Sequence, residues 1–157
     1  MVHRGIATTT TLLALCFLLL SHFDSQFFLI HFYESLIYIA IVLMLFYFED
    51  RWAYMMGMVA PAIWLVLNTA WNGAPSIGRQ ALNAFHPGSP FFATDFLTTA
   101  AYVLSVVLII SCANRWRREF GGLNKGWSTF LVSFAIAAVY YAVVVFWILR
   151  FPPPASR

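Results

Sequence analysis

The run FFLIHFYESLIYIAIVLMLFYF, residues 27–48, decides the class of fold. It contains one charged residue, Glu34, in a stretch long enough to cross a bilayer as a helix, which takes about 20 mainly apolar residues. The whole chain has this character, because 62% of its 157 residues are apolar and 10% are charged. Soluble domains have roughly 45–50% and about 25%. A chain this short could not bury so much apolar surface in a soluble core, so we predict an integral membrane protein.

The composition also excludes other classes of protein. Two cysteines are too few for a disulfide-stapled secreted module, and the high apolar content is the opposite of a disordered segment. Nine lysines and arginines, with a net charge of +3, do not make the basic surface of a nucleic-acid-binding domain. We therefore expect membrane lipids and other membrane proteins as partners, and no nucleic acid.

Four further apolar runs complete an all-α bundle, which forms one domain over residues 1–157. The first run is the weakest, because Thr8–Thr11 dilute it. It is readable as a signal peptide or as a retained helix, and we expect a retained helix because no small-x-small cleavage site follows Leu20. Only Glu49–Arg51 separate the second and third runs, which predicts a tight antiparallel hairpin. The predicted spans are approximately 6–23, 27–48, 52–71, 96–113 and 127–149.

The basic residues predict the orientation of these five spans, since short cytoplasmic loops accumulate lysine and arginine. With the N-terminus inside and the C-terminus outside, an outer loop covers 72–95, and its middle is expected to form a short surface helix. An inner basic loop then covers 114–126. We predict this topology in an inner or plasma-type membrane, with the inner loop anchored at anionic headgroups. The anchor consists of Arg115, Arg117, Arg118 and Lys125.

Glu34 lies well within a predicted span. A charge at such a depth costs at least ~2.5–3.5 kcal/mol on insertion scales, so an intramembrane carboxylate is a functional candidate by default. His31 lies one turn earlier on the same helix face, and Tyr38 one turn later. A hairpin that pivots between residues 49 and 50 brings Asn68 level with His31. We predict that these four side chains form a polar pocket that opens outward, and we assign none of them a catalytic role.

Further ionisable groups fall on the predicted outer side, and together with the pocket they offer a metal site or a proton path. Their spacing matches no metal-binding motif, so we predict no metal. His31 is the best candidate for an axial ligand to a haem or a chlorophyll-type ring. The plainest alternative is a polar cluster that fixes the hairpin register, with interhelical bonds of about 0.6 kcal/mol each. The outer groups are His22, Asp24, His86 and Asp95.

Three classes of function remain open. The first expectation is an accessory transmembrane subunit of a larger complex, respiratory, photosynthetic or similar, packed against partner helices with a bound pigment or lipid. The chain has little mass outside the spans and carries no phosphate-binding loop or nucleophile elbow, which favours this class. The second is a small carrier or ligand-binding protein that uses His31, Glu34 and Asn68. The third is a membrane enzyme acting on a lipid or isoprenoid, with Glu34 or His31 as acid or base.

Overall fold

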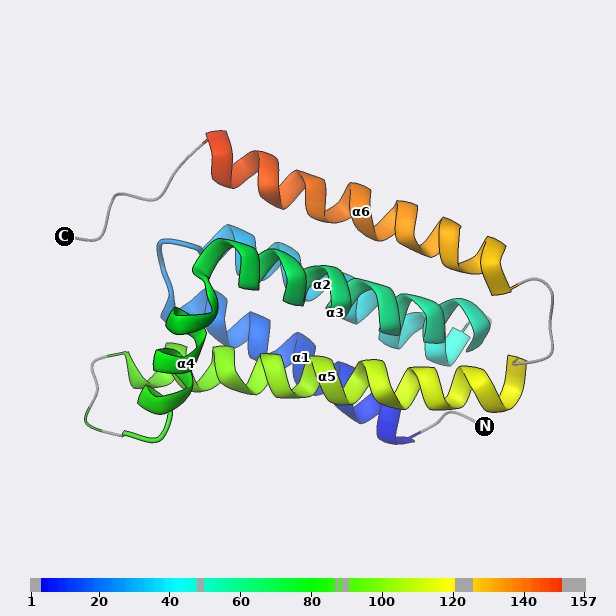
Figure 1. Ribbon diagram of the computed structural model, residues 1–157, viewed down its shortest axis with the longest axis horizontal. Coiled ribbons are helices and arrows are strands. Elements are labelled where there is room, and N and C mark those ends of the chain that lie inside the picture. Colours follow the sequence, from blue (N-terminus) through cyan, green and yellow to red (C-terminus); the bar gives the residue numbers. More distant parts are fainter. Residues whose placement is uncertain (1–3, 48–49, 87, 89–90, 121–125, 151–157) are drawn as a thin grey trace.

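The computed structural model describes residues 4–47, 50–86, 88, 91–120 and 126–150. Within these ranges all regular secondary structure is helical (Figure 1). Five of the six helices are long and apolar enough to cross a membrane, which confirms the predicted number of candidate spans. The helices are α1 (Arg4–Phe23), α2 (Phe28–Tyr47), α3 (Asp50–Asn72), α4 (Ala74–Asn83), α5 (Phe92–Phe120) and α6 (Gly126–Arg150).

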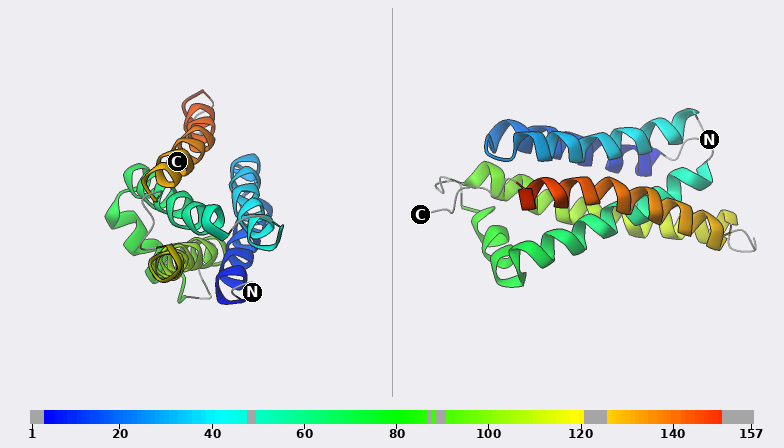
Figure 2. Two further views of the ribbon diagram at one scale, coloured as in Figure 1. Left: turned by 90° about the vertical axis from the view of Figure 1, so that its right-hand side faces the viewer. Right: turned by 90° about the horizontal axis from the view of Figure 1, so that it is seen from above.

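The five long helices run along one common direction, and α1 lies at one side of the bundle (Figure 2). α1 contacts α2 on one side and α5 on the other. α5 in turn packs against α3, and α6 also packs against α3 (Figures 1 and 2). Leu13 and Phe17 of α1 are fully buried among these neighbours. Without α1 the faces of α2 and α5 that it covers would be uncovered.

The second and third spans separate as they leave their short connection. α2 ends at Tyr47 and α3 begins at Asp50, as the predicted hairpin requires, and residues 48 and 49 lie outside the described part of the chain. From there α3 crosses the bundle toward α5, whereas α2 stays on α1 (Figure 2). The two helices diverge toward the other end of the molecule, where a cavity lies between them.

Gly57 allows the close approach of α3 to α5. A Cβ atom at this position would lie 2.7 Å from the Sγ atom of Cys112, a distance that real side chains do not adopt. Cys112 is fully buried at this contact, and Cys16 is buried in α1. Both cysteines are free thiols that fill the core.

The predicted inner basic loop 114–126 is wrong in extent, because residues 114–120 continue α5. A fall in hydropathy ends a membrane span but does not end a helix, and arginine is a good helix former. Arg115 Nε lies 2.7 Å from Glu119 Oε1, an i,i+4 pair that supports the helix. The ring of Trp116 contacts that of Phe120 in a tilted arrangement, with ring centroids 5.1 Å apart. Lys125, the last predicted anchor residue, lies outside the described residues.

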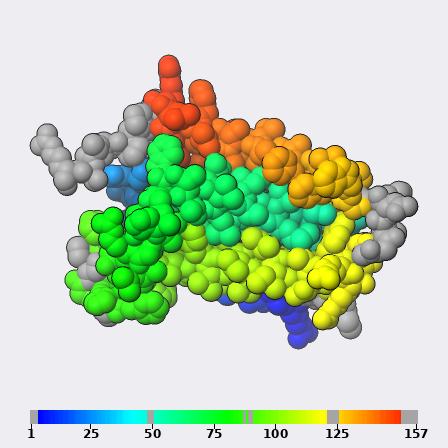
Figure 3. All heavy atoms as spheres, viewed as in Figure 1, coloured from blue at the N-terminus to red at the C-terminus, as the bar shows by residue number. Residues whose placement is uncertain are grey.

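The predicted outer loop 72–95 also contains more helix than expected. α4 occupies 74–83, and α5 begins at Phe92. α4 follows a turn at Gly73, whose φ of 75° favours glycine, and Pro75 stands at its first turn, where the missing N–H has no helical acceptor. The short helix covers one end of α3 and α5, across the direction of the bundle (Figures 1 and 3).

The helix ends divide into two groups. The basic end contains the start of α1, the junction of α2 with α3 and the end of α5, and most of the described arginines lie there. The cavity end contains α4, the start of α2 and the ends of α3 and α6 (Figure 1). The arginines of the basic end are Arg4, Arg51, Arg115, Arg117 and Arg118, whereas Arg79 and Arg150 lie at the cavity end.

Candidate functional site

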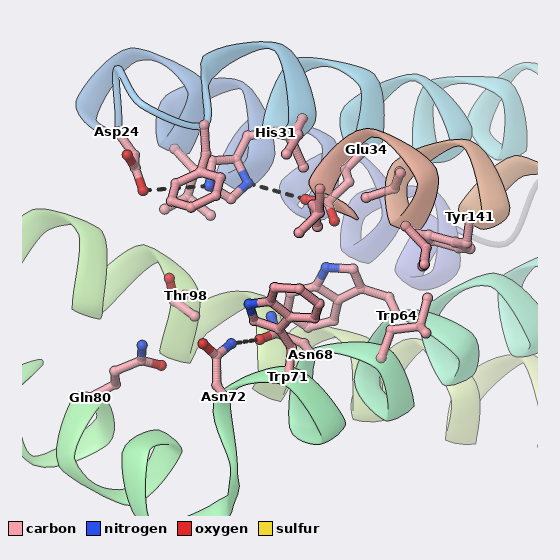
Figure 4. A pocket seen from close by; sticks show the side chains of 17 residues that line it. Asp24, His31, Glu34, Trp64, Asn68, Trp71, Asn72, Gln80, Thr98 and Tyr141 are labelled. Atoms are coloured by element: carbon pink, nitrogen blue, oxygen red, sulfur yellow. Dashed lines mark hydrogen bonds and ion pairs between the residues drawn. The ribbon is translucent and has the colours of Figure 1, made fainter. Parts of the chain in front are cut away.

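A cavity of about 290 Å³ lies where α2 and α3 diverge, and α6 forms its third wall (Figure 4). It brings together three of the four predicted site residues, His31, Glu34 and Asn68. The other polar lining residues come from the α1–α2 connection and from α3, α4 and α5. They are Asp24, Asn72, Gln80 and Thr98, and the aromatic walls include Trp64, Trp71 and Tyr141.

His31 lies between two carboxylates. Its Nδ1 is 3.1 Å from Oε2 of Glu34, and its Nε2 is 3.8 Å from Oδ2 of Asp24 (Figure 4). Glu34 is 7% exposed, while 30% of the Asp24 side chain remains accessible. The three groups therefore form a row that leads from a partly exposed carboxylate to a buried one.

Asp24 lies outside the helices, in the connection between α1 and α2. The contact with His31 lowers the pKa of its carboxyl below the ordinary value of 3.8, and partial burial opposes this effect. Backbone N–H groups of Phe27 and Gln26 donate to the same carboxylate and lower its pKa further. Asp24 is therefore ionised at neutral pH, and its Oδ2 faces His31 Nε2 at 3.8 Å.

The remaining proton of the row lies between His31 and Glu34. The ionised carboxylate of Asp24, 3.8 Å from Nε2, favours a proton on that nitrogen. The contact of Nδ1 with Glu34 is then a hydrogen bond in two arrangements. Either the ring is protonated and Glu34 ionised, or the ring is neutral and Glu34 carries the proton. Both arrangements contain the same number of protons, and both have a total charge of −1. The row thus places one negative charge in the cavity and one transferable proton at its buried end.

Asn68 lies on α3, across the cavity from His31 (Figure 4). Its Oδ1 accepts from Nδ2 of Asn72, one turn later on the same helix. Trp64 is buried one turn earlier, in edge contact with Phe17 of α1 at 5.2 Å between ring centroids. Asn68 thus lines the same cavity as His31, and its side-chain amide bonds to Asn72 within α3.

Tyr38 lies outside the cavity lining. It is fully buried one turn beyond Glu34 and stacks on Phe17, with ring centroids 5.3 Å apart. Its hydroxyl faces Ser105 of α5 and Tyr141 of α6. Tyr141 lines the cavity at this level in its place.

Of the four predicted outer groups, only Asp24 joins the site. His22 is exposed in the last turn of α1, and His86 Nδ1 lies 2.9 Å from the carbonyl of Leu82 beyond α4. Asp95 is buried in the first turn of α5. In the described part of the chain no three His, Cys, Asp or Glu side chains form a metal-binding group. Both nitrogens of His31 face carboxylates, so a haem or chlorophyll-type ligand there would have to replace one of these contacts.

Sequence reasoning missed the contribution of α6. Tyr33 of α2 and Tyr140 of α6 stack with ring centroids 4.2 Å apart. The Tyr33 hydroxyl donates to the Tyr140 carbonyl at 3.4 Å, and the Tyr140 hydroxyl donates to the Tyr33 carbonyl. This reciprocal contact joins α2 to α6 and sets Tyr141, the next residue, in the cavity wall. The one signal in the sequence was a pair of adjacent tyrosines in an otherwise apolar span.

No family model, curated protein or solved structure matches this chain at a significant level. The functional proposal therefore depends on the cavity and its residues alone.

Proposed function

We propose that this chain is a small multi-pass membrane protein that binds an apolar ligand with a cationic or hydrogen-bond-donating group. The observation that carries the proposal is the row Asp24–His31–Glu34 on the wall of a 290 Å³ cavity. Ligand pockets combine apolar walls with a few convergent polar groups, and this volume is near the lower limit of their usual range of about 300–1,000 Å³. The ligand is therefore small.

The partners of Glu34 favour a binding site over a structural cluster. A polar cluster that served to fix helix packing would bond between helices. The carboxylate of Glu34 instead contacts His31 of its own helix, and the amide of Asn68 contacts Asn72 of its own helix. The open space between these two pairs is the cavity, where a ligand could bond to both.

The charge of the site indicates the ligand chemistry. A total charge of −1 in a weakly polar cavity attracts a cation more strongly than the same charge would in water. The aromatic faces of Trp64, Trp71 and Tyr141 also favour a cation. A protonated amine on a short apolar body matches both features.

The distribution of arginines supports the predicted orientation of the chain in the membrane. Five arginines lie there, and the positive-inside rule then puts the N-terminus in the cytoplasm and the cavity end on the outer side of an inner or plasma-type membrane. The ligand then enters from the outer side, past Asp24.

Thermal unfolding of the purified full-length chain tests the proposal, with hexylamine, hexanol and hexanoate as probes. Hexylamine, which is protonated at neutral pH, is expected to raise the unfolding temperature saturably, and hexanoate is not. Glu34→Gln is expected to weaken the response to hexylamine to the level of the response to hexanol. Glu119→Gln, the same substitution at the basic end, is the matched control and is expected to respond like the wild type. Equal responses of the two variants would refute the proposed site.

The accessory-subunit function is a second candidate, supported by α6. This helix packs chiefly on α3, and Ala142 is exposed on it together with large apolar side chains. Ala138 and Ala142 form a small-xxx-small pair, which allows a further helix to approach closely. Purification from the native membrane in mild detergent tests this function by the mass and visible absorbance of the particle. A stable monomer with no bound polypeptide or pigment would contradict it. The exposed apolar residues of α6 include Phe134, Ile136, Val139, Val143, Phe146 and Leu149.

A further inference from the structure

A second cavity, also of about 290 Å³, lies at the basic end between the start of α1 and the last turns of α5. Three arginines line it, together with Ser111 and Asn114 of α5. The arginines are Arg4, Arg115 and Arg118.

The packing of α1 on α5 creates this group of arginines. Arg115 and Arg118 stand one turn apart on the same face of α5, because the helix continues to Phe120. Arg4, far away in the sequence, joins them because α1 and α5 are in contact. Arg117 is adjacent in sequence but does not line the cavity. The site is therefore a product of the fold and differs from the basic segment of the sequence.

The arginines are not neutralised within the cavity. Its described lining contains three guanidinium groups and no carboxylate. Arg115 has a partner in Glu119, whose Oε1 lies 2.7 Å from its Nε, but no such ion pair is found for Arg4 or Arg118 among the described residues. The positive charges of Arg4 and Arg118 at one cavity repel one another, and an anion within the cavity would reduce this repulsion.

We propose that this cavity binds a phosphate group. Guanidinium groups form paired hydrogen bonds with phosphate oxygens, and the Ser111 hydroxyl and Asn114 amide provide further donors. The cavity lies where two membrane-spanning helices end, which is the level of lipid headgroups, and basic pockets between such helices bind anionic lipids. The phosphodiester of an anionic lipid is therefore one source of the phosphate, and free phosphate is the other.

Binding of short-chain lipids to the purified full-length chain tests the proposal. The probes are dioctanoylphosphatidylglycerol, dioctanoylphosphatidylcholine and inorganic phosphate, with dissociation constants and stoichiometry from native mass spectrometry. We expect one saturable site for phosphatidylglycerol. Each arginine near an anionic headgroup contributes a factor of about five in affinity, so Arg4→Gln/Arg118→Gln is expected to weaken binding about 25-fold. Arg79→Gln/Arg150→Gln, which removes the same charge at the cavity end, is expected to change it less than about two-fold.

The outcomes separate the source of the phosphate from the existence of the site. Phosphatidylglycerol that binds more tightly than inorganic phosphate identifies a lipid site, and equal binding identifies a site for free phosphate. Equal losses in the two double variants, or no binding of either anion, would overturn the proposal. If the glutamine variant does not fold, Arg4→Lys/Arg118→Lys keeps the charge but loses the paired hydrogen bonds, and it is expected to bind with intermediate affinity. Wild-type affinity in this lysine variant would also contradict the proposed contacts.

Discussion

Tyr33 and Tyr140 each donate a hydroxyl hydrogen bond to the backbone carbonyl of the other, while their rings stack at 4.2 Å. This pair links α2 directly to α6, and the two helices also line the same cavity. Both hydroxyls lie within spans, where lipid tails offer no hydrogen-bond acceptor. The backbone carbonyl of the other helix supplies that acceptor.

Removing one hydroxyl is expected to weaken the link without disturbing the rest of the bundle. Tyr140→Phe should destabilise the protein by about 0.6 kcal/mol, the mean for interhelical hydrogen bonds in membranes. Thermal unfolding in detergent measures the effect, and Tyr47→Phe is the control, because Tyr47 is 77% exposed. If Tyr33→Phe and Tyr140→Phe together cost no more than either change alone, the two bonds act as one unit. An unchanged unfolding temperature in both single variants would contradict the link.

The pH dependence of stability is expected to depend on Asp24. Its pKa is lowered in the folded state from the ordinary value of 3.8 by His31, so its contribution is present above this value. The contribution is lost as the pH falls below 3.8 through the folded-state pKa, where the carboxylate becomes protonated. Asp24→Asn should therefore lower the unfolding temperature at neutral pH, by the equivalent of about 0.2–1 kcal/mol for a partly exposed ion pair. If Asp24→Asn lowers the unfolding temperature equally at neutral and at strongly acidic pH, the charge of the Asp24 carboxylate has no role in stability.

The close contact of Gly57 with Cys112 predicts a specific rescue. Gly57→Ala should destabilise the protein by about 1–3 kcal/mol, because its Cβ would overlap the Sγ of Cys112. Cys112→Ala removes this sulfur, so the double variant should be more stable than the sum of the two single effects predicts. Cys112→Ser keeps an atom at the same place and should rescue less. If the destabilisation of the double variant equals the sum of the two single effects, Gly57→Ala does not contact Cys112.

The sequence was sufficient for the features that depend on local patterns. Five apolar runs predicted five long helices, and the short connection at Glu49–Arg51 predicted the common depth of His31 and Asn68. The predicted ends of α5 were wrong. Hydropathy detects where a helix leaves the apolar part of the membrane and not where its backbone hydrogen bonding stops. The contacts of α6 could not be predicted either. Its apolar surface is nearly uniform in sequence, so nothing before the structure selects the face that carries Tyr140 and Tyr141.

The same limit applies to both cavities. Asp24 and His31 are separated by a helix start, and Arg4 is separated from Arg118 by most of the chain, so neither group is a sequence motif. The first group forms across the start of α2, and the second forms because α1 packs against α5. For a bundle of this kind, the sequence limits the set of candidate polar residues, and the packing decides which of them share a site.

The role of charge at Glu34 can be separated from the role of cavity shape. Glu34→Gln keeps the size of the side chain and changes the total charge of the row from −1 to zero, if His31 and Asp24 remain an ion pair. Hexylamine should then lose its advantage over hexanol, while hexanol stabilises the variant as much as the wild type, because the apolar walls are unchanged. Thermal unfolding with both probes over a range of concentrations measures the ratio of the hexylamine response to the hexanol response. If the variant loses the response to both probes equally, the carboxylate maintains the cavity and does not recognise a cation. In that case the −1 charge is not the feature that selects the ligand.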